Sequence, residues 1–129
     1  MQNEANILIY VVDDDESVRK ALKMLLVSAG MEARTFQSAE DFLRCNPRQD
    51  NTCLITDIKM QGMSGIELQR QLARQGSKMP VIFLTAVASK ANREQAKQAG
   101  ANGYFRKPVD DQALLDTIHL ALSPDGVAA

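Results

Sequence analysis

The sequence predicts an α/β domain in which a five-stranded parallel sheet is covered by helices on both faces. The first apolar run, ILIYVV at 7–12, is continuous rather than alternating, which is typical of a strand covered on both faces. Further runs of strand length alternate with segments whose apolar residues recur every three and four positions. Parallel strands need such helical crossovers, because a tight hairpin joins only antiparallel strands.

Each element is predicted by a local pattern. Apolar and β-branched runs predict strands at 7–12, 32–36, 52–56, 81–84 and 103–105. Between and after them, apolar spacing and capping residues predict five helices. The first ends before Gly30, the second opens at Ser38, and the third spans 65–74 and is ended by Gly76. The fourth opens at Ser89, and the last is capped by Asp110. We interpret 1–122 as one domain and 123–129 as a tail or the start of a linker.

Length, composition and charge exclude several classes of protein. A chain of 129 residues with 45% hydrophobic residues fits one core. The 15 basic and 16 acidic side chains nearly cancel, so this chain lacks the positive field of a nucleic-acid-binding domain. It has neither a basic secretory start nor an apolar run of membrane-spanning length, so we expect it in the cytoplasm. Cys45 and Cys53 have no metal or redox spacing and are expected to be reduced, buried or half-buried thiols.

Polar side chains follow four of the predicted strands, at the edge of the sheet where open α/β sheets bind ligands. Asp13 and Asp14 follow the first strand, Asp57 the third, Thr85 the fourth and Lys107 the fifth. The second strand, which ends in TF, adds no chemistry. Each of these residue types is ordinary in a loop, so the prediction of a site depends on their joint arrival at one edge.

The residue types at this edge indicate phosphoryl chemistry. Three carboxylates close together repel one another and call for a cation, and Mg²⁺ prefers one or two carboxylates with water and phosphate oxygens. Asp13 or Asp14 would hold the ion and Asp57 would share it. Asp57 can then attack a phosphoryl group as a nucleophile, with Lys107 as the second cation.

Three neighbouring features support the same chemistry. Thr85 places a hydroxyl that could donate to a phosphoryl oxygen. The loop at 58–64 supplies backbone groups, and Gly62 permits a tight path. The peptide bond between Lys107 and Pro108 is hypothesised to be cis, which would aim the lysine.

Four motifs resemble the receiver domain of two-component response regulators. They are VVDDDESVRKAL, LITDIKMQGMSGIEL, VIFLTA and GYFRKP, which follow one another in that order between positions 7 and 122. Their wording is especially similar to receivers that precede a helix-turn-helix output domain, as in nitrogen-fixation regulators. The resemblance implies a flavodoxin-like doubly wound fold with strand order 2-1-3-4-5.

The resemblance also implies a mechanism for the site. A sensor histidine kinase would pass its phosphoryl group to Asp57, with Mg²⁺ held by Asp13, Asp14, Asp57 and the backbone carbonyl of Lys59. In similar proteins the second acid of the pair is the more direct metal ligand. Gln61 departs from the family pattern, which usually has proline here, and it leaves the φ angle of this loop less constrained.

Signalling is implied in the same way. Thr85 would move toward the phosphoryl group and Tyr104 would turn inward, which reports the added charge to the face made by the fourth helix and fifth strand. Similar receivers use that face for phosphorylation-dependent dimers or for an output domain, and the first helix for the kinase. DNA would be contacted only through an output domain absent from this chain, and the expected outcome is control of transcription.

Two other functions fit parts of the sequence. The segment at 13–17, DDDES, approximates the DxDx(T/V) motif of haloacid-dehalogenase-like phosphatases, but those enzymes need a further acidic pair after the fourth strand, and VIFLTAVASK has none. That interpretation also leaves Asp57 idle. A receiver-like binding module that is never phosphorylated would be expected to lack an acid or the lysine, and here none is missing. We therefore expect a switch and not an enzyme.

Overall fold

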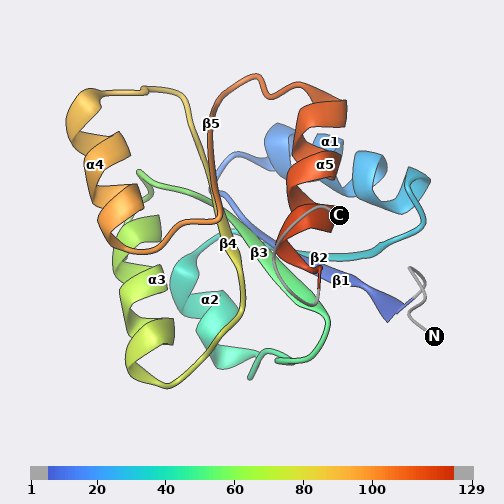
Figure 1. Ribbon diagram of the computed structural model, residues 1–129, viewed down its shortest axis with the longest axis horizontal. Coiled ribbons are helices and arrows are strands. Elements are labelled where there is room, and N and C mark those ends of the chain that lie inside the picture. Colours follow the sequence, from blue (N-terminus) through green and yellow to red (C-terminus); the bar gives the residue numbers. More distant parts are fainter. Residues whose placement is uncertain (1–5, 124–129) are drawn as a thin grey trace.

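The computed structural model describes residues 6–123, in which strands and helices alternate along the chain (Figure 1). The strands are β1 (Leu8–Val12), β2 (Glu32–Phe36), β3 (Thr52–Asp57), β4 (Val81–Thr85) and β5 (Gly103–Arg106). The helices are α1 (Glu16–Ser28), α2 (Ala39–Arg44), α3 (Gly65–Arg74), α4 (Lys90–Gln98) and α5 (Asp111–Ala121). Apart from Ser123, the predicted tail at 123–129 lies outside the described residues.

The five strands form one parallel sheet in the order β2-β1-β3-β4-β5, as the sequence predicted. Helices α1 and α5 cover one face, and α2, α3 and α4 cover the other (Figure 1). Successive side chains of a strand point to opposite faces, so Tyr10 packs on the side of α2 while Ile9 and Val11 pack on the side of α1. Both faces of β1, β3 and β4 are therefore buried, which explains their continuous apolar runs.

Three aromatic rings anchor the short helix α2 to the sheet. The Phe42 ring lies edge-on to Tyr10, with centroids 5.1 Å apart, and 5.7 Å from the ring of Phe36. Phe42 and Ala39 are fully buried. Ser38 caps the helix by accepting a hydrogen bond from the backbone N–H of Asp41. Although α2 has only six residues, its position against β1 and β2 is fixed by burial.

The predicted helix ends are confirmed, with small shifts at the strands. Ser38, Ser89 and Asp110 are N-caps, and Gly30 and Gly76 adopt positive φ just beyond the ends of α1 and α3. Strand β1 begins one residue later than predicted, and β3, β4 and β5 each run one residue further, because each of these three pairs with a neighbour up to its last residue. Residues that we assigned to the site therefore belong to the strands themselves.

The burial of the two cysteines agrees with the sequence interpretation. Both thiols are free; Cys53 is fully buried and Cys45 is half-buried. Burial raises the pKa of the Cys53 thiol to about 12. Within the described part of the chain, every helix is too short or too polar to span a bilayer.

Candidate functional site

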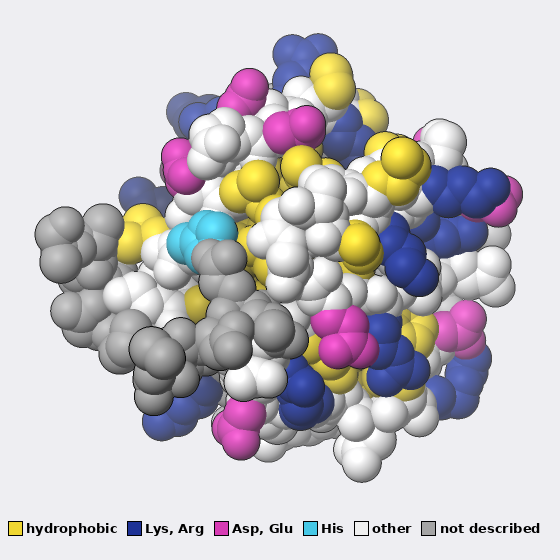
Figure 2. Space-filling model, turned by 90° about the vertical axis from the view of Figure 1, so that its right-hand side faces the viewer, with side chains coloured by type: hydrophobic (Ala, Val, Ile, Leu, Met, Phe, Trp, Pro, Cys, Tyr) yellow, Lys and Arg dark blue, Asp and Glu magenta, His cyan; other side chains and the backbone are white. Residues whose placement is uncertain are grey.

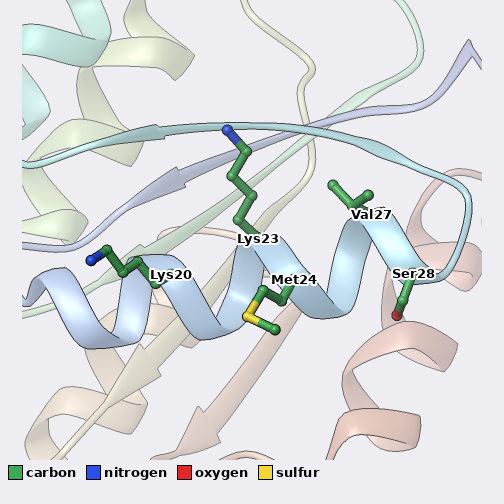
Figure 3. Close-up of a pocket in the computed structure, with 5 residues that line it drawn as sticks. All are labelled: Lys20, Lys23, Met24, Val27 and Ser28. Carbon is green, nitrogen blue, oxygen red and sulfur yellow. The ribbon is translucent and has the colours of Figure 1, made fainter.

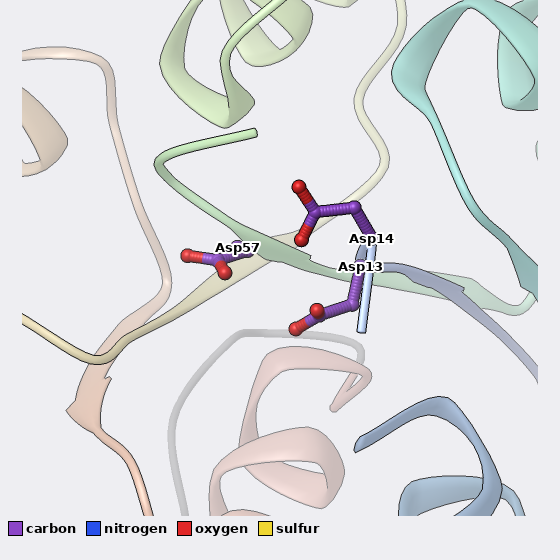
Figure 4. Close-up of side chains that lie close together, drawn as sticks. All are labelled: Asp13, Asp14 and Asp57. Atoms are coloured by element: carbon purple, nitrogen blue, oxygen red, sulfur yellow. The ribbon is translucent and has the colours of Figure 1, made fainter. Parts of the chain in front are cut away.

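The register of the sheet brings the predicted acids together at its carboxyl edge. Val12 of β1 lies beside Thr56 of β3, so the residues that follow them, Asp13 and Asp57, become neighbours. Asp14 comes from the same β1–α1 loop. One carboxylate oxygen from each acid can be chosen so that all three lie within 4.8 Å of one another (Figure 4). Asp13 and Asp57 are buried, whereas Asp14 is exposed.

The backbone around Asp13 is held on several sides. Its N–H donates to the carbonyl of Phe36 at 3.1 Å, and its own carbonyl accepts from the Arg19 guanidinium at 2.7 Å. One oxygen of its carboxylate accepts from the backbone N–H of Asp15 at 2.9 Å, and Asp15 in turn caps α1 by accepting from Ser17. These bonds fix the direction of the Asp13 side chain before any ligand arrives.

Lys107, which directly follows β5, joins the acids at the same edge of the sheet. Its Nζ lies 2.8 Å from Oδ2 of Asp13 and 2.9 Å from Oδ2 of Asp57. Its backbone N–H donates to the carbonyl of Thr85 at 2.8 Å, which ties the ends of β4 and β5 together. The peptide bond between Lys107 and Pro108 is cis, as hypothesised. The two contacts of Nζ place the ammonium between the buried carboxylates of Asp13 and Asp57.

The pKa shifts describe an incompletely neutralised site. Burial raises the pKa of the Asp13 carboxyl and outweighs the opposing hydrogen bond from Lys107. Burial also acts to lower the pKa of the Lys107 ammonium, but its hydrogen bonds and attraction to Asp13 and Asp57 prevail, so that pKa is raised. Lys107 thus stays charged at neutral pH, but it pairs with only two of the three clustered acids, Asp13 and Asp57. A further cation would relieve the remaining negative charge.

The donor set at this edge fits Mg²⁺. It consists of carboxylate oxygens, with no nitrogen or sulfur ligand among the clustered acids, and hard oxygen ligands are what Mg²⁺ prefers. Lys59, the predicted source of a backbone ligand, lies in the loop directly after β3. Its N–H donates to Oδ1 of Asp57 at 3.3 Å. The loop backbone therefore touches the carboxylate that the sequence singled out.

Thr85 lies on β4, the strand next to β3, and Tyr104 lies on β5, one strand further from the acids. Leu84 is the register partner of Asp57, so buried Thr85 follows directly beside the site. Its hydroxyl donates to the carbonyl of Val87 at 3.1 Å and accepts from the N–H of Val87 at 3.2 Å. Tyr104 is half-buried on β5, with Arg93 5.5 Å from its ring centroid and its hydroxyl buried without a hydrogen-bond partner.

Sequence reasoning missed several residues that shape this edge. A Cβ atom at Gly65 would lie 2.0 Å from the carbonyl oxygen of Asp57, so α3 begins in direct contact with the end of β3. Ser64 and Glu67 form a capping box at the same helix start, which the S-x-x-E spacing could have indicated. Glu40 accepts a hydrogen bond from the N–H of Met63. No local pattern reveals that last contact, because its partners are far apart in the sequence.

A second hollow, which shares no residue with the acidic cluster, lies along α1. It is a shallow depression open to solvent, with a volume of about 520 Å³, and is lined by Lys20, Lys23, Met24, Val27 and Ser28 (Figure 3). Met24 is 75% exposed and Val27 is 54% exposed. Figure 2 shows the side at the right of Figure 1, where hydrophobic side chains lie in separate groups among charged ones. No carboxylate lines this hollow, so it lacks the acids that make the carboxyl edge a candidate for phosphoryl chemistry.

Comparison with known proteins agrees with this geometry. The transcriptional regulatory protein TdiR of Thauera aromatica is 41% identical over 115 residues, which cover 89% of this chain and 51% of TdiR. The response regulator protein TodT of Pseudomonas putida is 38% identical over 122 residues, which cover 95% of this chain and 53% of TodT. The chain thus spans about half the length of these curated relatives.

Solved structures and a family model give the same answer. The crystal structure of FixJ-N superposes with a TM-score of 0.84 at 34% identity, covering 100% of this chain and 99% of that chain. The family model described as the response regulator receiver domain matches residues 9–119. With the motifs, the strand order and the acidic edge in agreement, the chain belongs to the receiver domain family of two-component response regulators.

Proposed function

We propose that this domain is a phosphorylation-activated switch in which Asp57 accepts a phosphoryl group from a sensor histidine kinase. The observation that carries the proposal is the bridging contact of Lys107, whose Nζ lies within 2.9 Å of carboxylate oxygens from Asp13 and Asp57. A lysine in this place can neutralise charge on the oxygens of a transferring phosphoryl group. An ordinary surface ion pair would not require two buried acids from different strands.

The reaction is an exchange of one bond for another at phosphorus. An oxygen of the Asp57 carboxylate forms an O–P bond while the P–N bond of the donor phosphohistidine breaks. The departing imidazole nitrogen keeps the electron pair. Asp57 attacks as a carboxylate, and Lys107 donates a hydrogen bond to one of its two oxygens. Asp13 orients Lys107 from the other side.

Mg²⁺ is the proposed cofactor, held by Asp13, Asp14, Asp57 and the backbone carbonyl of Lys59. When bound, the ion neutralises the carboxylates and the phosphoryl oxygens and so reduces the repulsion between them. Asp13 already accepts hydrogen bonds from Lys107 and from the backbone of Asp15, whereas Asp14 is exposed. This difference supports Asp14 as the more direct ligand of the pair.

The signal is proposed to leave through Thr85 and Tyr104. The hydroxyl of Thr85 exchanges its bonds with Val87 for a phosphoryl oxygen, and the ring of Tyr104 moves further inward in response. Tyr104 already packs partly against the core beside α4, so a small movement of the β4–α4 turn changes its surroundings. The altered face comprises α4 and β5.

The partners follow from the same proposal. Two relatives carry names of regulators, one of them explicitly transcriptional, and both are about twice the length that this chain covers. We propose that the domain acts in the cytoplasm, that its α4–β5 face contacts an output domain or a second copy in a phosphorylation-dependent homodimer, and that any DNA contact is made by that output domain. The proposed outcome is control of transcription.

The decisive experiment is incubation with Mg²⁺ and acetyl phosphate, followed by intact mass spectrometry. We expect one phosphoryl adduct in the wild type and none in the Asp57→Asn variant, which preserves the size of the side chain. Omission of Mg²⁺ should also abolish the adduct. Asp50→Asn serves as a matched control because Asp50 is exposed, and it should be labelled like the wild type.

Two other results would point elsewhere. Steady release of phosphate from many phosphate esters, with Asp13 essential and Asp57 dispensable, would favour a phosphatase. A wild-type protein that binds neither Mg²⁺ nor phosphoryl groups would favour a binding module that is never phosphorylated. Each of these results would refute the proposed switch.

A further inference from the structure

A long-range hydrogen bond holds the loop that follows Asp57. This loop spans residues 58–64, between β3 and α3. The backbone N–H of Met63 donates to Oε2 of Glu40 at 3.0 Å, and the contact is partly buried. Glu40 lies in the first turn of α2, 23 residues away in the sequence. A carboxylate from one helix thus secures the backbone of a loop that belongs to another unit of the fold.

Glu40 is carried by a rigid support. Its neighbours Ala39 and Phe42 are fully buried, and Phe42 packs edge-on against Tyr10 of the central strand β1. Ser38 caps the helix on the other side. Because these contacts fix α2 against the sheet, the Glu40 carboxylate can transmit that position to the loop.

The loop is shaped to receive this carboxylate. Gly62 has a φ of +79°, and a Cβ atom built there would lie 2.8 Å from Oε2 of Glu40. Glycine adopts this positive φ without strain and leaves room for the carboxylate. Gln61, which precedes it, is exposed and leaves its own φ free to rotate. The loop therefore gains its constraint from outside, through Glu40, and not from its own residues at the apex.

The same loop touches the phosphoacceptor. The N–H of Lys59 donates to Oδ1 of Asp57 at 3.3 Å, and Lys59 is also the proposed source of a carbonyl ligand for Mg²⁺. At the other end, Gly65 donates to the carbonyl of Ile58 at 2.9 Å, which closes the loop. A shift at Met63 is therefore passed along a short, closed segment to the backbone next to the reacting carboxylate.

From these contacts we infer that Glu40 is a positioning residue, which holds the 58–64 loop in the geometry needed to bind Mg²⁺ beside Asp57. The inference rests on the proposed function, because the metal is part of that proposal. Glu40 itself touches neither metal nor phosphoryl group; it acts through Met63 and the loop. Its loss loosens the loop without removing any ligand.

The experiment compares Glu40→Ala with Glu40→Gln and with Asp41→Ala. Glutamine retains an oxygen that can accept the Met63 hydrogen bond. Asp41 lies in the same first turn and is also acidic, but it pairs with Arg44 on its own helix. Its removal controls for the loss of a favourable negative charge at the start of α2.

Two readouts are independent of phosphorylation: amide hydrogen exchange at Met63, followed by NMR, and the Kd for Mg²⁺, measured by calorimetry. In Glu40→Ala we expect exchange at Met63 to accelerate about tenfold or more, since a bond to a charged acceptor is lost. The Kd should rise about tenfold, the effect typical of removing an outer-shell support. Glu40→Gln should lie close to wild type in Kd, and Asp41→Ala should match wild type in both readouts.

The outcomes separate this inference from the proposed function. If the wild type binds Mg²⁺ and Glu40→Ala binds it equally well, the positioning role is refuted while the proposed function stands. If Asp41→Ala weakens Mg²⁺ binding as much as Glu40→Ala, the effect belongs to the stability of α2 and the inference again fails. A wild type that binds no Mg²⁺ would overturn both.

Discussion

Replacement of Lys107 by methionine tests the electrostatic account of the site most directly. Methionine keeps an unbranched side chain of similar length but carries no charge, so packing is largely retained while the ammonium is lost. The Lys107 side chain is only 18% exposed, and those of Asp13 and Asp57 are 2% and 10% exposed. Solvent therefore cannot replace the lost cation easily.

The size of the effect follows from the geometry. Two unit charges separated by 4.8 Å, the upper limit for the chosen oxygens, repel by roughly 3 kcal/mol at an effective dielectric constant of about 20. In the wild type, Lys107 offsets this repulsion through contacts of 2.8 and 2.9 Å. We therefore expect Lys107→Met to lower the free energy of unfolding by about 3 kcal/mol in the absence of Mg²⁺, a value typical of breaking a buried ion pair.

Urea unfolding followed by circular dichroism measures this loss. The cost of Lys107→Met should fall well below 3 kcal/mol in an Asp57→Asn background, because one of the two repelling charges is already absent. The pKa of Asp13 is already raised by burial in the wild type, and removal of Lys107 acts in the same direction. A carboxyl with a raised pKa in the folded state favours folding as the pH falls. The difference in the free energy of unfolding between the wild type and Lys107→Met should therefore be largest near neutral pH and should become smaller on acidification.

Two results would refute this reasoning. The first is a Lys107→Met variant as stable as the wild type without Mg²⁺. The second is an equal cost of the substitution in the presence and absence of the Asp57 charge, which would mean that Lys107 stabilises the fold through packing alone. Addition of Mg²⁺ should restore part of the lost stability, since a bound cation takes over the neutralising role.

A pair of glycine substitutions and a thiol-labelling experiment test the packing of the fold. Gly65→Ala should cost about 3 kcal/mol of stability, because its Cβ would lie 2.0 Å from the carbonyl oxygen of Asp57. Gly76→Ala, with a φ of +83° but nothing within 4 Å of its Cβ, should cost only about 1 kcal/mol, and similar losses in urea unfolding would contradict the close approach at Gly65. The Cys53 thiol, with its pKa at about 12, should react with iodoacetamide only in the unfolded protein, whereas half-buried Cys45 should react in the native state; peptide mass spectrometry distinguishes them.

The fold was predictable because burial on both faces leaves a direct trace in the sequence. Strands β1, β3 and β4 are continuous apolar runs, and parallel pairing then places whatever follows them at one edge. This is why Asp13 and Asp57 could be expected to meet. The hydrogen bond from Met63 to Glu40 could not be expected, because it depends on how far the 58–64 loop leans toward α2. Neither segment carries a pattern that specifies that distance.

The resting bonds of Thr85 set the cost of the change of partner that the proposed switch requires. Its hydroxyl contacts only the backbone N–H and carbonyl of Val87, in a turn where the Val87 residue is 64% exposed. If the hydroxyl leaves, water can satisfy those backbone groups, so the loss is limited to the net value of ordinary hydrogen bonds, about 1 kcal/mol each. A bond to a charged phosphoryl oxygen is roughly twice as strong as a neutral one. Without the phosphoryl group the hydroxyl would lose about 2 kcal/mol and gain nothing, whereas with it the new bond offsets that loss, so the change of partner depends on the phosphoryl group.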